Sequence, residues 1–88
     1  MLQDEFKIFF ARSKLRISIL NKLNEKPQIA TFLAKEMNKH REVISRIFAD
    51  LQNKKLAKCQ NPRDPHFRYY QITKKGKTIL KEVKSEYN

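Results

Sequence analysis

Most side chains in this sequence that could do chemistry are cations, and they are concentrated in one part of the chain. Residues 39–77 carry eleven Lys or Arg and three Asp or Glu, a net charge of +8, whereas residues 1–38 carry +3 and residues 78–88 are neutral. The whole chain of 88 residues has a formal charge of +11. Because a charge of this size attracts polyanions, the sequence predicts a nucleic acid as the partner, met mainly by residues 39–77.

No arrangement of residues typical of an enzyme accompanies these cations. The one glycine in the sequence, Gly76, excludes the glycine-rich loops that bind nucleotide phosphates. The sequence also lacks a Ser/His/Asp arrangement with a glycine elbow, and it lacks paired carboxylates in an apolar setting. Cys59, His40 and His66 are possible metal donors, but their spacing matches no usual zinc pattern. We therefore expect that the protein is not an enzyme and needs neither a cofactor nor a metal.

The length and the hydropathy of the chain limit the architectures that it can adopt. A chain of 88 residues has material for one hydrophobic core, so we expect a single domain over residues 1–88. The longest apolar run, residues 8–11, is far shorter than the roughly 20 residues that span a bilayer, and we expect a cytoplasmic protein. The only cysteine, Cys59, cannot form a disulfide within the chain. We expect it to pack as a small buried hydrophobe.

Helical periodicity predicts the element that carries many of the cations. Between residues 40 and 53 the apolar side chains recur at i, i+3, i+4 and i+7, the spacing of one buried helix face. These side chains are Ile44, Ile47, Phe48 and Leu51. Further helices are predicted at residues 4–11, 13–24, 31–38 and 74–86, with Ser13, Thr31 and Thr73 as N-caps and Asn38 as the left-handed residue after the third.

Two strands are predicted between the cationic helix and the last helix. Residues 56–60 and 67–73 have the β-branched and aromatic content of strands, and residues 61–66 between them contain two prolines that stiffen the loop. If strand alternation turns Tyr70 and Ile72 inward, Phe67 and Tyr69 lie on the other face. The expected fold class is α+β, mainly α with a small β-hairpin, in the order helix, helix, helix, strand, strand, helix.

Residues 32–51 have the parts of a helix-turn-helix. It needs small and apolar residues where its helices cross, a left-handed residue in the turn, and apolar residues on the second helix, here Leu33, Ala34, Met37, Asn38, Ile44 and Ile47. Together with residues 16–20 and 70–76, this segment resembles the winged helix-turn-helix transcriptional regulators, especially the small ArsR-like and MarR-like proteins of archaea, bacteria and archaeal viruses. Two residues depart from the family's pattern, because Asn38 replaces a usual glycine and Lys39 a usual apolar residue.

The resemblance implies that the helix at residues 40–53 enters the major groove of duplex DNA, with the loop at residues 61–66 as a wing on the backbone or minor groove. Arg46 is the leading base reader, because its planar fork matches the two acceptors of guanine. The other implied contacts of the recognition helix are Lys39, His40, Arg41, Glu42 and Ser45. Glu42 either accepts from cytosine or pairs with its neighbouring arginines. The implied contacts of the helix end and the wing are Lys54, Lys55, Arg63, His66 and Arg68.

The terminal segments are candidates for a dimer interface. In proteins that resemble this one the terminal helices form a homodimer, which implies that residues 1–12 and 74–88 are dimerisation elements. Their apolar side chains are Phe6, Phe9, Phe10, Leu80, Val83 and Tyr87. The same side chains could instead be ordinary core.

Two other binding functions stay open at this point. An RNA-binding or ribosome-associated winged helix would expose stacking aromatic side chains on a strand, and Tyr69 is the candidate for this role. A protein-interaction winged-helix module would dock its partner on the phenylalanines near the N-terminus, and high salt would leave that binding largely intact.

Overall fold

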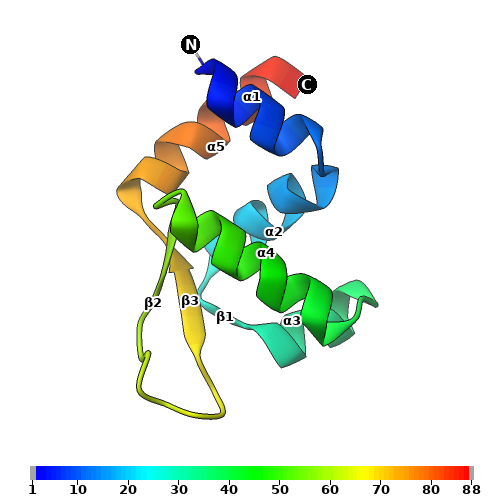
Figure 1. The fold of residues 1–88 in the computed structure, drawn as a ribbon, viewed down its shortest axis with the longest axis vertical. Helices are drawn as coiled ribbons and strands as arrows, with labels where there is room; N and C mark the ends of the chain where they lie inside the picture. The colour runs from blue at the N-terminus through cyan, green and yellow to red at the C-terminus, as the bar shows by residue number, and fades with distance from the viewer. Residues whose placement is uncertain (1, 88) are drawn as a thin grey trace.

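The structure is a computed structural model and describes residues 2–87, except for the side chain of Tyr87. Within this range helices dominate, and a small sheet lies beside them (Figure 1). The helices are α1 (Asp4–Ala11), α2 (Lys14–Glu25), α3 (Ala30–Met37), α4 (Arg41–Asn53) and α5 (Lys74–Tyr87). The strands are β1 (Gln28–Ile29), β2 (Ala57–Cys59) and β3 (Tyr69–Ile72). The predicted α+β class, mainly α, is confirmed.

The sheet has a strand that the sequence does not reveal. Its order is β1-β3-β2, and both pairs are antiparallel. The prediction of a two-stranded hairpin is therefore corrected to three strands. Strand β1 has only two residues, both buried, so it shows no alternation from which a strand could be recognised. It pairs Ile29 with Tyr69 and runs directly into α3, which places α3 against the sheet.

The helix ends follow the predicted signals in part. Asn38 adopts the left-handed conformation with φ 56° and ψ 50° and ends α3, as predicted. The Thr73 hydroxyl accepts a hydrogen bond from the Gly76 N–H at 2.9 Å, as a cap of α5 should. Ser13 occupies the N-cap position of α2 without a side-chain capping bond. The prediction that Thr31 caps α3 is wrong, because the N-cap is Ile29, which still belongs to β1.

The predicted apolar helix faces meet in one core. Ile44, Phe48 and Leu51 of α4 are fully buried, and Ile47 is nearly so. They pack with buried residues of the other helices, among them Ile19, Leu20 and Leu23 of α2 and Leu33 of α3. The sheet joins this core through Tyr70, whose ring centroid lies 4.7 Å from that of Phe48. Helix α4 is therefore fixed by one face, and its other face is left toward solvent.

The terminal helices also belong to this core. Five side chains expected at a dimer interface are buried within the single chain, namely Phe6, Phe9, Phe10, Leu80 and Val83. The Tyr87 side chain lies outside the described part of the structure. Helix α1 lies against α2 and near α5 (Figure 1), so the aromatic side chains of α1 fill the space between helices. The prediction that these five residues form an exposed dimer interface is therefore corrected, because they lie in the interior. A homodimer stays a prediction, but it cannot use this interface.

Gly76 shows why a glycine occurs at the start of α5. A Cβ atom at this position would lie 2.7 Å from Cγ1 of Ile72 and would overlap the Leu56 carbonyl oxygen. The Thr73 N–H donates to the same Leu56 oxygen at 3.0 Å. Close packing of α5 on the chain before β2 therefore requires a residue without a side chain. This packing holds the base of the hairpin formed by β2 and β3.

Candidate nucleic-acid interface

The solvent face of α4 carries the predicted base-reading residues. Arg41, Glu42 and Arg46 are exposed, and Ser45 is half-buried. The Arg46 side chain makes no hydrogen bond or ion pair within the described range 2–87. The Arg41 guanidinium and the Glu42 carboxylate are 4.0 Å apart and both exposed, so their attraction is weak. These side chains are therefore available to an external partner.

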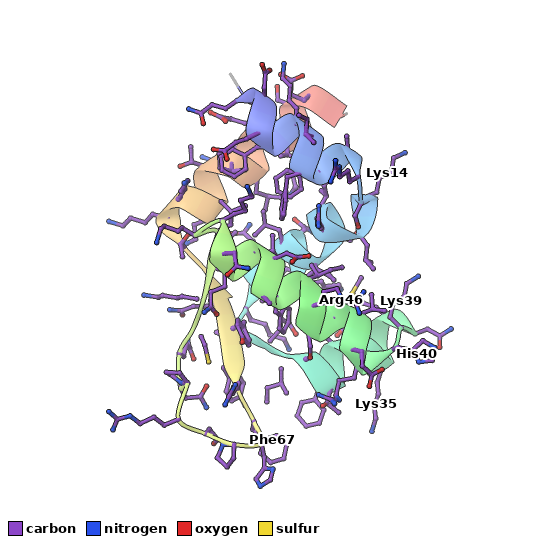
Figure 2. All side chains as sticks on the ribbon, in the orientation of Figure 1. Lys14, Lys35, Lys39, His40, Arg46 and Phe67 are labelled. Carbon is purple, nitrogen blue, oxygen red and sulfur yellow. The ribbon has the colours of Figure 1, made fainter. Side chains whose placement is uncertain are left out.

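The turn between α3 and α4 extends this polar surface. Because Asn38 is left-handed, the Lys39 N–H turns back and donates to the Ala34 carbonyl at 2.9 Å. Lys39 itself is exposed, which agrees with its departure from the apolar residue usual in such turns. Figure 2 shows Lys35, Lys39 and His40 pointing outward around this turn. Lys35 is missing from the predicted site, although its position opposite the buried Leu33 and Ala34 is a signal for an exposed cation.

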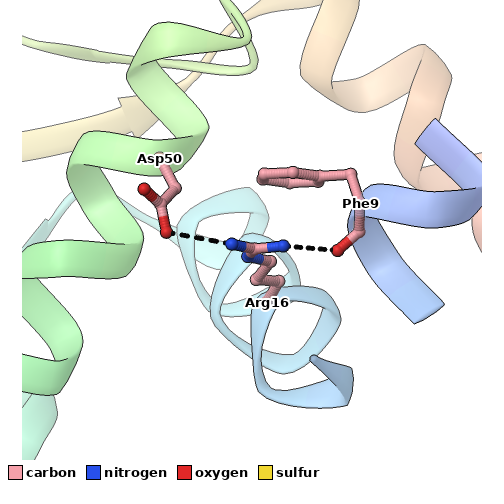
Figure 3. A network of polar contacts seen from close by, with 3 residues as sticks. All are labelled: Phe9, Arg16 and Asp50. Carbon is pink, nitrogen blue, oxygen red and sulfur yellow. Dashed lines mark hydrogen bonds and ion pairs between the residues drawn. The ribbon is translucent and has the colours of Figure 1, made fainter. Parts of the chain in front are cut away.

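A polar network fixes α4 to the first two helices, α1 and α2. Arg16 of α2 donates from Nη1 to the Phe9 carbonyl at 2.6 Å and from Nη2 to Asp50 of α4 at 3.2 Å (Figure 3). Its guanidinium carbon also lies 4.0 Å from the Phe9 ring centroid. The Arg16 side chain is only 19% exposed, so this charge is partly desolvated and its partners matter. The network connects α1, α2 and α4 through one side chain.

Side-chain hydrogen bonds fix the loop between β2 and β3. Asn61 donates to the Phe67 carbonyl at 2.7 Å and accepts from the Tyr69 N–H at 2.8 Å. Asp64 accepts from the N–H groups of His66 and Phe67, each at 2.9 Å, and these bonds hold the pKa of its carboxyl below the usual value. Neither residue is part of the predicted site, although Asn and Asp beside prolines are typical of such turns.

The structure brings four predicted contacts together in one cleft between α4 and this loop. The cleft has a volume of about 310 Å³ and is lined by residues of α4, the loop, α3, β1 and β3. Arg41 and Ser45 line it from α4, and His66 and Arg68 from the loop. Thr31 of α3 adds a hydroxyl. This concave surface therefore presents two guanidinium groups, an imidazole and two hydroxyls. Together they can bind an anion such as a phosphate.

Three other predicted contacts lie elsewhere. Lys54, at the end of α4, places its Nζ 3.5 Å from a Glu5 carboxylate oxygen and 5.9 Å from the Phe9 ring centroid, so it faces α1. Lys55 is exposed and left-handed with φ 64°. Arg63 is exposed in the loop but is not part of the cleft lining. The Glu5 carboxylate therefore makes the Lys54 ammonium less available for a phosphate contact.

The outward face next to the loop is aromatic. As strand alternation predicts, Phe67 and Tyr69 are exposed, at 52% and 43%, whereas Tyr70 turns inward and burial raises the pKa of its hydroxyl. Phe32 of α3, which was not predicted for any site, is 55% exposed and stacks on Phe67 with 6.2 Å between ring centroids.

Cys59 is half-buried, and its Sγ lies 3.8 Å from Asn61 Oδ1, so the expectation of full burial is corrected.

Within residues 2–87, no three His, Cys, Asp or Glu side chains are grouped so that they could hold a metal ion. In the same range no helix has the length and apolarity needed to cross a membrane. Comparisons with protein-family models, curated proteins and solved structures found no match for this chain.

Proposed function

We propose that the protein is a cytoplasmic winged helix-turn-helix transcriptional regulator that binds double-stranded DNA in a sequence-specific manner. The single observation that supports this most strongly is the cleft in which Arg41 and Ser45 of α4 meet His66 and Arg68 of the loop. A helix and a loop that present cations on one concave surface fit a duplex, whose grooves and phosphates alternate.

In this proposal α4 enters the major groove. The groove is about 12 Å wide and admits one α-helix, and the positive end of the helix dipole faces phosphate. Arg46 reads a base edge, because it is exposed and has no partner in the described part of the chain that would have to be displaced. Small Ala49 on the same face lets the helix lie close to the bases.

The loop between β2 and β3 acts as the wing. His66 and Arg68 contact phosphates next to the groove, and Arg63 reaches the backbone or the adjacent minor groove. Asn61 and Asp64 hold the loop in one shape before DNA is bound. Less conformational entropy is then lost on binding, which favours affinity.

A homodimer would place two α4 helices about 34 Å apart, one turn of duplex, and would recognise a near-palindrome. Because the apolar side chains of the terminal helices are buried, this dimer needs another contact. The exposed side of α1, where Ile8 is 57% exposed, is the candidate.

The proposal is tested by selecting binding sites from a library of random 20-bp duplexes and titrating the selected duplex at several salt concentrations. We expect one enriched sequence, bound at least about 10³-fold more tightly than the random pool. No enrichment, together with no binding to any duplex, would contradict the regulator and favour the protein-interaction module.

A further inference from the structure

A second concave surface lies beside the cleft, between α3 and β3. It has a volume of about 270 Å³ and is lined by two exposed aromatic rings, Phe32 of α3 and Tyr69 of β3. The buried Ile29 of β1 also lines it, together with Lys26 and Glu36. We call this surface the aromatic pocket. Ile29 also lines the cleft described above, so the two surfaces are adjacent.

The aromatic rings here lie outside the buried core. Four large apolar side chains are strongly exposed in the described chain, and three of them, Phe32, Phe67 and Tyr69, surround this region. Phe67 stacks on Phe32 with an angle of 24° between the rings, and this pair borders the pocket. The His66 ring, which lines the cleft, lies 6.5 Å from Phe67. The stacked pair therefore stands between the cationic cleft and the aromatic pocket.

We infer that the aromatic pocket binds an unpaired nucleobase of a single-stranded nucleic acid whose phosphates lie in the cationic cleft. Every base presents a flat π face that stacks on aromatic side chains, and single-strand binding proteins combine such rings with a cationic track for the backbone. Here Arg68 and His66 supply the track and Phe32 and Tyr69 the rings. Lys26 at the pocket can contact the next phosphate.

The surrounding charges favour a nucleic acid over an apolar protein segment. The chain carries +11, and the acidic group at the pocket, Glu36, is paired with Lys22 at 2.6 Å. The carboxylate that faces the pocket is therefore compensated. This second site shares the cleft with the proposed duplex site. It does not require that α4 reads bases, because no residue of α4 lines the aromatic pocket.

The inference is tested by fluorescence anisotropy with labelled 12-nucleotide single strands of DNA and RNA and a 20-bp duplex. Phe32→Ala and Tyr69→Ala should each weaken single-strand binding about 5- to 150-fold, the loss typical of one stacked base. Binding of the duplex should change less than about twofold, since its bases remain paired. The control is Thr78→Ala, which shortens an exposed, uncharged side chain of α5 that lines neither the cleft nor the pocket, and it should change neither affinity.

A second measurement reports stacking directly, and its first part uses only the natural chain. A strand with one 2-aminopurine should lose fluorescence on binding to the natural chain, and a strand with an abasic site at that position should bind more weakly. With Phe32→Leu, which keeps an apolar side chain but no ring, the fluorescence should be retained. Equal affinity for DNA and RNA would indicate contacts to bases and phosphates alone, and tighter RNA binding would add a contact to the 2′-hydroxyl.

Three results would overturn the inference. The first is single-strand affinity that is unchanged in both aromatic variants. The second is equal binding of abasic and normal strands, which would mean that only charge is recognised. The third is failure of all single strands to bind, which would assign the pocket to a protein partner. Because the duplex is measured in parallel, failure here is distinguishable from failure of the regulator proposal.

Discussion

At the scale of single residues, exposure and missing partners separate candidate binding side chains from structural ones. Arg46 and Arg16 are both helical arginines, but Arg46 is exposed without a partner in the described chain, whereas Arg16 is bound to Phe9 and Asp50. Sequence periodicity distinguishes the exposed from the buried face of a helix. It cannot show which polar residue is used by the fold, because that depends on contacts across 34 residues of chain.

Replacing Arg46 should reduce discrimination between DNA sequences. In Arg46→Ala the selected duplex should lose about 1–3 kcal/mol of binding free energy, because a bidentate contact to guanine is removed. Lys39→Ala is the matched control, since a phosphate contact should weaken all duplexes alike and lower the salt slope by about 0.9. Competition titrations with single-base variants of the site measure both. Equal losses on selected and random duplexes for Arg46→Ala would contradict base reading.

Gly76→Ala should destabilise the fold. The new Cβ would overlap the Leu56 carbonyl oxygen, and backbone cannot move aside as a side chain can. Although Ala is favoured in helices, we expect a net loss of about 1–3 kcal/mol in the free energy of unfolding from overpacking. Chemical denaturation measures it, and Lys81→Ala at an exposed site of α5 should stay within about 0.5 kcal/mol. An unchanged midpoint for Gly76→Ala would show that α5 can shift away from β2.

At the scale of elements, α4 and the loop between β2 and β3 are positioned by different means. Helix α4 is fixed by its buried face and by the contact of Asp50 with Arg16, whereas the loop is fixed by Asn61 and Asp64. The sequence predicts the helices from periodicity and the two longer strands from their β-branched and aromatic content. It does not predict β1, because two buried residues have no pattern, nor the cleft, which forms only when distant elements meet.

Asp50→Ala should loosen α4. It would leave the partly desolvated Arg16 guanidinium without its carboxylate, at a cost of about 1–2 kcal/mol in the free energy of unfolding. Lys22→Ala, which breaks the exposed pair with Glu36, is the control and should have little effect. Thermal unfolding by circular dichroism compares the two. A larger loss for Lys22→Ala than for Asp50→Ala would contradict the structural role of the Arg16 network.

The order of the loop should depend on acid pH. Backbone N–H groups of Phe67 and His66 lower the folded pKa of Asp64 from its usual 3.8. The stabilisation is therefore fully present above about pH 3.8 and is lost as the pH falls through the lower folded pKa. NMR shifts of both amides should report this transition. Asp64→Asn keeps an acceptor and should abolish the transition, and a shift change near neutral pH instead would contradict this origin.

At the scale of the whole molecule, the proposed binding groups and the aromatic residues of α1 belong to different parts of the fold. The chain is elongated, with Cα extents of 37 × 25 × 20 Å, and α1 lies at the end opposite the loop between β2 and β3 (Figure 1). Aromatic residues of α1 that could have formed a dimer surface are core instead, since so short a chain needs them to complete its interior. A run of phenylalanines alone does not distinguish these two uses. The surface that carries the proposed binding groups lies around α4 and the loop.

The most direct test of the central claim is the affinity of the natural chain for a selected duplex and for random duplex, measured as a function of salt. We expect the selected duplex to bind at least about 10³-fold more tightly. The logarithm of affinity should fall by about 0.9 for each phosphate contacted per logarithmic unit of salt. Equal affinity for all duplexes at every salt concentration would contradict a sequence-specific regulator and leave only non-specific attraction between a +11 chain and DNA.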